Sequence, residues 1–157
     1  MKNKKYTGRE GETNQGFTLI EMLVVLSVFT LLVTITLPYI SAWYSPVKLR
    51  GAQRELISNL RFTQQNAVTS QRNHLIRFFK AGNYYNIIKK EGGEQILKTV
   101  FLPVGITFSV INLAPLPSEV EFNSAAAPNS TGEITLINNK GETKKVEVTP
   151  SGFVKGD

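Results

Sequence analysis

The pattern of hydrophobic positions divides the chain into three parts. An apolar run without any charged residue extends from Met22 to Val47. As a helix, its roughly 26 residues would be about 39 Å long, which is enough to cross a hydrocarbon core of about 30 Å. A stretch of helical periodicity and a series of short strand-like runs follow. The pattern therefore predicts a membrane-spanning helix ahead of a globular region.

The second part repeats apolar residues at spacings of three and four. This spacing places them on one face of an amphipathic helix, which we expect at about 47–72, with Pro46 in the first turn of a renewed helix. The residues expected on the buried face are Leu49, Ala52, Leu56, Leu60, Thr63 and Ala67. The remaining positions are largely filled by Gln53, Glu55, Ser58, Arg61 and Gln64.

The third part consists of short runs rich in β-branched and aromatic residues, separated by Gly or Pro. They fall into two clusters on either side of a stiff connector at 114–117. We therefore expect an α+β fold in which a long N-terminal helix, transmembrane in its first half and amphipathic in its second, packs on two small antiparallel β-sheets. The runs lie at 74–80, 83–89, 95–101 and 105–111, and at 119–123, 132–137, 144–149 and 152–155.

Glu21 directly precedes the uncharged run. A charged side chain at bilayer depth costs about 2.5–3.5 kcal/mol on insertion scales. In one interpretation the carboxylate lies at a helix N-terminus and at headgroup level, which are both favourable places for it. In the other, it pairs with a buried cation. The apolar run alone does not decide between them.

The residues before the run are polar and basic, with Lys2, Lys4, Lys5 and Arg9 against Glu10 and Glu12. The positive-inside rule then keeps the N-terminus in the cytoplasm and places the bulk of the chain outside. A secretory signal has a similar layout, and cleavage at Ile40-Ser41-Ala42 would release a soluble secreted domain. That tripeptide is a poor small-x-small cleavage site, so we favour a retained helix.

The stretch "GFTLIEMLVVLSV", which begins at Gly16, resembles the cleavage and methylation motif of type IV prepilins and pseudopilins. The resemblance implies that a membrane-embedded prepilin peptidase cuts after Gly16 and N-methylates Phe17, so that residues 1–16 are a cytoplasmic leader. It further implies that Glu21 serves subunit assembly, by pairing with the Phe17 amine of a neighbour or by recruiting the subunit to the growing filament.

Pro38 interrupts the apolar segment. Proline lacks a backbone N–H and clashes with the carbonyl four residues earlier, here Thr34, so it kinks or loosens a helix. Thr34 or Thr36 could satisfy the freed groups. Pilin-like proteins commonly have a proline at this distance from the cleavage site, where the helix can melt in a filament. A mild kink near the outer interface explains the residue equally well.

The order of parts extends the resemblance to the GspH/FimT-type minor pseudopilins. "FTQQNAV", the "EFN…G" step and the closing "PSGFV" most resemble the competence pseudopilins of Gram-positive bacteria. The resemblance implies a subunit of a DNA-uptake filament, held in the cell membrane by a single pass and displayed on the cell surface after assembly. It implies as partners other major and minor pseudopilins, the prepilin peptidase, the inner-membrane assembly platform and membrane lipid. A type II secretion system or another type IV pilus is the alternative setting. The expected divisions are 1–16 (leader), 17–44 (transmembrane), 45–73 (amphipathic helix) and 74–157 (β-rich domain).

The formal net charge of +6 is compatible with lipid, wall polymer or nucleic acid. Lys48, Arg50 and Arg54 lie just beyond the expected membrane exit, with Arg50 and Arg54 one turn apart on one face, and could bind lipid phosphates or wall polymers. The candidates for an anion or DNA contact are Lys140, Lys144, Lys145 and Lys155. Some FimT-type pilins bind DNA through a C-terminal arginine motif, but this chain has no arginine after Arg77. We therefore favour a solvated basic face over a DNA-binding minor pilin.

The sequence does not indicate an enzyme, a cofactor or a metal site. It has no cysteine, one histidine (His74) and one aspartate (Asp157), so no nucleophile–base–acid set is suggested. We expect His74 to be a half-exposed structural residue. Glu119 and Glu121 share a strand face, and such a pair is more typical of a solvated edge than of a calcium site.

Overall fold

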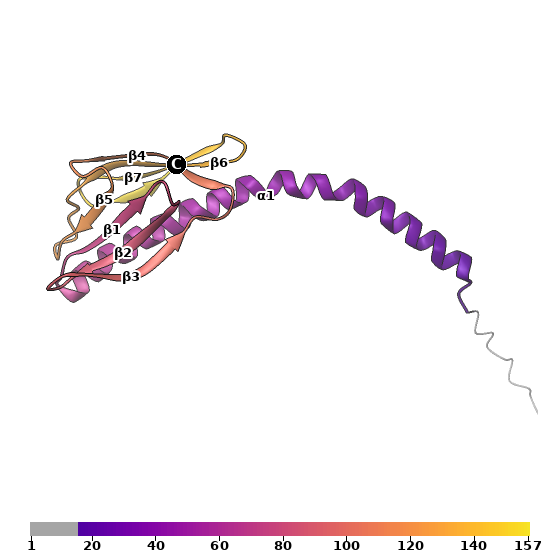
Figure 1. The fold of residues 1–157 in the computed structure, drawn as a ribbon, viewed down its shortest axis with the longest axis horizontal. Helices are drawn as coiled ribbons and strands as arrows, with labels where there is room; N and C mark the ends of the chain where they lie inside the picture. Colours follow the sequence, from indigo (N-terminus) through magenta and orange to yellow (C-terminus); the bar gives the residue numbers. More distant parts are fainter. Residues whose placement is uncertain (1–15) are drawn as a thin grey trace, which may run out of the picture. The chain divides into compact units, whose positions relative to one another are not determined.

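The computed structural model describes residues 16–157, except for the side chains of residues 37–43. It divides into a unit up to Ile40 and a compact unit from Ser41 to Asp157, and each is described by itself. The predicted leader therefore lies outside the described residues, apart from Gly16. A single helix, α1 (Leu19–Ser70), begins in the first unit and ends in the second (Figure 1).

The sequence suggested that a new helix begins at Pro46, but α1 is continuous through this position. Pro46 lies in the interior of α1, where it removes one backbone hydrogen bond without ending the helix. The helix ends at Ser70, two residues before the predicted boundary. The next residue, Gln71, has a left-handed backbone (φ 53°), and the Arg72 N–H donates to the Ala67 carbonyl. This geometry closes the last turn.

The β-rich domain contains two four-stranded antiparallel sheets, which confirms the predicted α+β class. The first sheet has the order β3-β2-β1-β5 and the second the order β4-β6-β7-β8 (Figure 1). The strands of the first sheet are β1 (His74–Phe79), β2 (Tyr84–Lys90), β3 (Glu94–Phe101) and β5 (Glu119–Phe122). Those of the second are β4 (Ile106–Ala114), β6 (Thr131–Asn138), β7 (Thr143–Val148) and β8 (Val154–Gly156).

The two sheets do not coincide with the two clusters of runs in the sequence. β4 closes the first cluster but pairs with β6, with Ile111 opposite Ile134. β5 opens the second cluster but pairs with β1, with Val120 opposite Ile76. The chain thus crosses between the sheets three times, after β3, after β4 and after β5. Local periodicity identifies strands, whereas pairing between distant strands depends on which faces can be buried together.

The hydrophobic core lies between α1 and the inner faces of both sheets. All six helix positions that were predicted to be buried are at most 3% exposed. Tyr85 is the largest fully buried side chain, and its hydroxyl oxygen accepts a hydrogen bond from Asn59 Nδ2 (2.7 Å). Burial raises the pKa of Tyr85 to about 12. The sheet residues in this core include Ile76, Phe78, Ile87, Val120, Phe122, Phe108, Ile134, Leu136, Val146 and Val148.

Ion pairs attach the crossover strand β5 to the first sheet. Arg77 of β1 pairs with Glu119 (2.8 Å) and with Glu94 of β3 (2.7 Å). Lys90 of β2 pairs with Glu121 (2.6 Å), and this contact raises the pKa of Lys90. The side chains of Glu119 and Glu121 are only 15% and 13% exposed. The expectation of a solvated carboxylate edge was therefore wrong, because each carboxylate is matched by a cation on another strand of the same sheet.

His74 also differs from expectation. Its side chain is buried (3% exposed), and Nδ1 lies 3.0 Å from the Arg72 carbonyl oxygen. As the first residue of β1 it lies opposite Phe122 of β5. The residue is therefore buried in the domain rather than half-exposed, in keeping with a structural role.

We expect Gly132→Ala to lower the free energy of unfolding of residues 41–157 by about 2 kcal/mol or more. Gly132 has φ +140°, and a Cβ there would lie 2.1 Å from the Asn112 carbonyl oxygen of the paired strand. The matched control is Gly51→Ala in α1, where a Cβ would meet nothing within 4 Å. That change should be neutral or stabilising by up to about 1 kcal/mol, because alanine favours the helix. Urea unfolding monitored by circular dichroism measures both, and equal effects would contradict the strand contact.

Candidate functional site

The candidate site begins where the chain enters α1. Gly16 and Phe17 lie ahead of the helix, outside regular secondary structure. Phe17 is 83% exposed, and a Cβ placed on Gly16 would meet nothing within 4 Å. The peptide bond between them is therefore open to another protein.

Thr18 and Glu21 form a capping box at the helix start. The Glu21 N–H donates to Thr18 Oγ1 (3.2 Å), and the Thr18 N–H donates to Glu21 Oε2 (3.0 Å). The Thr18 hydroxyl also donates to Oε2 (3.0 Å). Reciprocal bonds of this kind satisfy backbone donors that a helix N-terminus otherwise leaves unpaired. Glu21 thus caps the helix through specific hydrogen bonds, whereas the sequence indicated only that a helix N-terminus favours a negative charge.

The capping box occupies only one oxygen of the carboxylate. Both bonds from Thr18 go to Oε2, and no described residue donates to Oε1. A carboxylate can accept up to about four hydrogen bonds. Glu21 therefore keeps acceptor capacity and most of its charge for a donor from outside the chain.

The helix that follows is apolar on every side. Its segment Leu19–Thr36 has a mean hydropathy of 2.4 and no part of it is buried within the structure. The hydroxyls of this segment bond to its own backbone: Ser27 to Val24, Thr30 to Leu26, Thr34 to Thr30 and Thr36 to Leu32. Such a surface suits lipid or the equally apolar helix of another subunit.

Pro38 lies within α1, and its side chain is among those not described. Thr34 and Thr36 were expected to satisfy backbone groups that the proline leaves free. Instead, both hydroxyls donate one turn earlier, to the carbonyls of Thr30 and Leu32. The carbonyl of Thr34 is therefore not compensated by these two side chains.

The four candidate lysines do not form one basic patch. Lys140 lies in the turn after β6, and the adjacent Lys144 and Lys145 alternate across β7. Glu133 raises the pKa of Lys145 above its ordinary value. Acceptors within the domain bind the ammonium groups of Lys144 (the Asp157 carbonyl, 2.8 Å), Lys145 (the Glu133 carboxylate, 3.0 Å) and Lys155 (the Glu147 carboxylate, 3.0 Å). These pairs reduce the positive potential that a DNA phosphate would meet.

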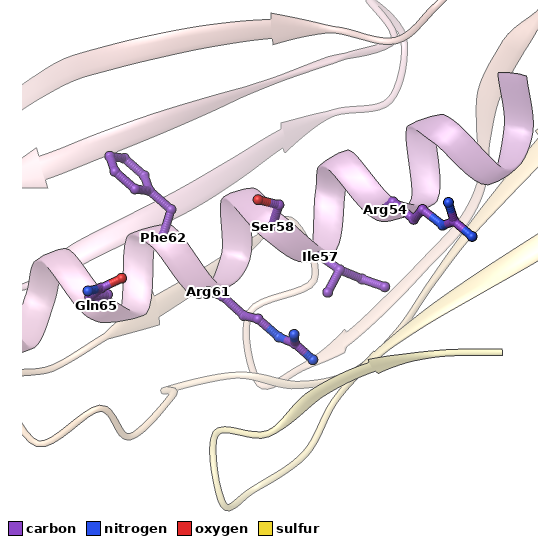
Figure 2. A pocket seen from close by; sticks show the side chains of 6 residues that line it. All are labelled: Arg54, Ile57, Ser58, Arg61, Phe62 and Gln65. Atoms are coloured by element: carbon purple, nitrogen blue, oxygen red, sulfur yellow. The ribbon is translucent and has the colours of Figure 1, made fainter.

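A shallow hollow runs along the exposed side of α1 (Figure 2). Arg54, Ile57 and Arg61 point toward the C-terminal strands, and Phe62 points away from them (Figure 2). Arg61 Nη2 donates to the Val154 carbonyl oxygen (2.9 Å). Ser58 and Gln65 complete the lining. The lining is basic and apolar without an acid or a general base, which suits a contact surface better than a reaction site.

Two glutamines that the sequence placed on the polar side of α1 are structural. Gln53 Nε2 donates to the carbonyls of Lys145 and Asp157, and Gln64 Nε2 to those of Ala126 and Gly152. A Cβ on Gly156 or Gly152 would lie 2.6 or 2.7 Å from these two amide nitrogens. In the sequence, the glycines of the C-terminal strand and turn could have indicated that the helix approaches closely there.

Among residues 16–157, no group of three or more His, Asp or Glu side chains is placed to hold a metal. The arrangement that remains is an exposed junction, a partly satisfied carboxylate, an unburied apolar helix and a domain with mixed contact surfaces. These are features of a subunit that assembles with others.

Residues 13–37 match the family of the prokaryotic N-terminal methylation motif. The chain is 30% identical over 122 residues to the competence protein ComGD of Bacillus subtilis (strain 168), covering 78% of this chain and 79% of that protein. The fold is similar to that of the minor pseudopilin EpsH from the type 2 secretion system of Vibrio cholerae, with a TM-score of 0.60, 11% identity, and 70% of this chain and 96% of that chain covered. It is also similar to the type IV minor pilin FimU of Pseudomonas aeruginosa (strain PAO1), with a TM-score of 0.57, 17% identity, and 71% and 90% covered. At such identities, EpsH and FimU establish a shared fold only.

The pairing of the C-terminal lysines can be tested by removing their partners. Glu133→Gln combined with Glu147→Gln should strengthen salt-sensitive retention of residues 41–157 on immobilised duplex DNA, because Lys145 and Lys155 lose their carboxylates. The wild type should elute at lower salt than this variant. Tight wild-type binding that Lys145→Ala and Lys155→Ala abolish would instead show that these lysines already contact DNA.

Proposed function

Because the chain belongs to the ComGD family of type IV pilin-like minor pseudopilins, we propose that it is cut after Gly16, N-methylated on Phe17 and built into a competence filament. Pilin-family proteins are structural subunits rather than enzymes. The 30% identity to ComGD supports a role in competence. With the secretion pseudopilin EpsH the chain shares only its fold, so a secretion system is the weaker alternative.

The observation that carries this proposal is the half-occupied carboxylate of Glu21. A cut after Gly16 creates a cationic amine at Phe17, four positions before Glu21. The Thr18 bonds go to Oε2, and Oε1 has no donor among residues 16–157. In a bundle of apolar helices, the amine of a neighbouring subunit can supply both a donor and the opposite charge. A buried pair of this kind offsets much of the desolvation that each charge suffers alone.

The membrane arrangement follows from the same segment. Residues 1–16 form the cytoplasmic leader, and residues 17–44 cross the cell membrane once. The amphipathic helix of residues 45–73 and the β-rich domain of residues 74–157 lie outside. The apolar helix then passes from lipid to the interior of a filament, where Pro38 is the place at which it loosens. The partners are the prepilin peptidase, the membrane assembly platform and other major and minor pseudopilins.

Processing is tested by the N-terminus of the mature protein. Mass spectrometry of the protein from cells with the peptidase should find N-methyl-Phe17, and Gly16→Leu should leave the full precursor, because a small residue is needed at the cut. Gly51→Ala is the control for an unrelated glycine. A mature chain that starts at Trp43 would show instead that the apolar segment is a cleaved secretory signal.

The pairing role of Glu21 can be separated from its capping role by two variants. Glu21→Gln keeps an oxygen that can cap Thr18 but loses the charge. Thr18→Val loses the hydroxyl but keeps the charge. We expect Glu21→Gln to be processed normally and to enter filaments at least about tenfold less, which corresponds to 1.4 kcal/mol or more, and Thr18→Val to assemble almost normally. Quantitative blotting of sheared filaments measures both. If Glu21→Gln assembles normally while Thr18→Val fails, capping rather than pairing explains the carboxylate.

A further inference from the structure

Two loops of the second sheet lie beside the first turns of α1 in the unit of residues 41–157. Lys48 Nζ donates to the Val104 carbonyl oxygen (3.4 Å), and Ser45 Oγ donates to Asn139 Oδ1 (2.7 Å). The loops also approach each other, because a Cβ on Gly105 would lie 3.9 Å from Asn139 Cγ. Both therefore sit at the end of the unit from which α1 continues toward the apolar segment.

This end exposes large apolar side chains. Val104 is 89% exposed, and Tyr44 and Val47 are each 59% exposed. Single exposed apolar residues are common on protein surfaces. Here Tyr44 and Val47 are three positions apart on α1, and Val104 belongs to a loop that Lys48 of α1 contacts. These three apolar side chains therefore lie together at one end of the unit.

The same end is basic. The Lys48 ammonium lies over the Tyr44 ring, 4.6 Å from its centroid, and Arg50 is exposed. No carboxylate among residues 16–157 forms an ion pair with Lys48 or Arg50. Along the chain, there is no acidic residue between Glu21 and Glu55. Apolar side chains beside cations are typical of a surface that rests on anionic lipid.

We propose that this membrane-facing end, defined by Tyr44, Val47, Lys48, Arg50 and Val104, docks on the outer surface of an anionic bilayer while the subunit is stored in the membrane. The inference rests on the membrane arrangement proposed above. A lipid surface is the expected partner of this end because only a short stretch of chain joins it to the apolar segment. Thr36, the last residue of the apolar window, is only eight residues before Tyr44 along the chain. Lipid headgroups therefore lie within reach of Val104 and the two cations.

The docking surface can be tested with single cysteines, because the chain has none of its own. Full-length protein with Val104→Cys is labelled with an environment-sensitive fluorophore and reconstituted in vesicles of phosphatidylglycerol and phosphatidylcholine. Nitroxide lipids then quench the label at headgroup depth or near the bilayer centre. Val28→Cys reports the apolar segment.

Phe153→Cys is the matched control. Phe153 is also apolar, in a turn, and 58% exposed. Its neighbour Gly152 accepts a hydrogen bond from Gln64, which lies sixteen residues beyond Lys48 on α1. Sixteen helical residues correspond to about 24 Å. A domain that rests on lipid by its membrane-facing end keeps this turn in water.

We expect the headgroup nitroxide to quench the Val104 label at least about twofold more strongly than the Phe153 label. When neutral lipid replaces phosphatidylglycerol, the Val104 label should lose about half of this quenching. Quenching of Val28 alone would overturn the docking and leave the membrane span intact. Equal quenching of Val104 and Phe153 would also overturn it, and equal quenching in neutral vesicles would overturn the anionic specificity. Without deep quenching of Val28, the membrane span itself fails and the docking fails with it.

Discussion

Burial of one stripe of α1, from Leu49 to Ala67, holds the two sheets in a single domain. The sheets face the helix with apolar side chains, and the stripe is the surface that both share. Leu56 and Leu60 are completely buried, and full burial of such side chains is worth about 1.5–3 kcal/mol each. Gln53 and Gln64 then bond the C-terminal strands and loops to the flanks of the stripe. The positions of the C-terminal lysines and of the membrane-facing end within residues 41–157 follow from this packing.

The same helix meets a different requirement before residue 40. Between Leu19 and Thr36 it is apolar all round and covers nothing in its own chain. Helix propensity and intrahelical hydroxyl bonds stabilise it in lipid, while its outward surface stays available for other helices. The exception is Glu21, where the capping box uses one oxygen and leaves the other. A carboxylate that is half satisfied within the subunit is tolerable before assembly and still gains from a cation supplied by a neighbour.

The periodicity of the sequence predicted the helix stripe and the eight strands, because both depend on local alternation of apolar residues. It did not predict that β4 and β5 exchange sheets, since that pairing is decided by contacts far apart in the chain. The motif around Gly16 and Glu21 was recognisable in the sequence, but the capping hydrogen bonds between Thr18 and Glu21 were not predicted. Charged residues were the least predictable. Glu121 was interpreted as solvated, although Lys90, two strands away in the first sheet, neutralises it.

The distribution of charge also changes how the net charge of +6 is to be interpreted. Near the C-terminus, Lys145 and Lys155 face Glu133 and Glu147, so the basic residues there are offset within the second sheet. At the start of the domain, Lys48 and its neighbour Arg50 have no carboxylate opposite them among residues 16–157. Because unpaired cations attract anions more strongly than cations already held in ion pairs, the membrane-facing end has a larger effective positive charge than the paired lysines of the second sheet. The protein's basic character therefore fits storage at a lipid surface better than contact with nucleic acid.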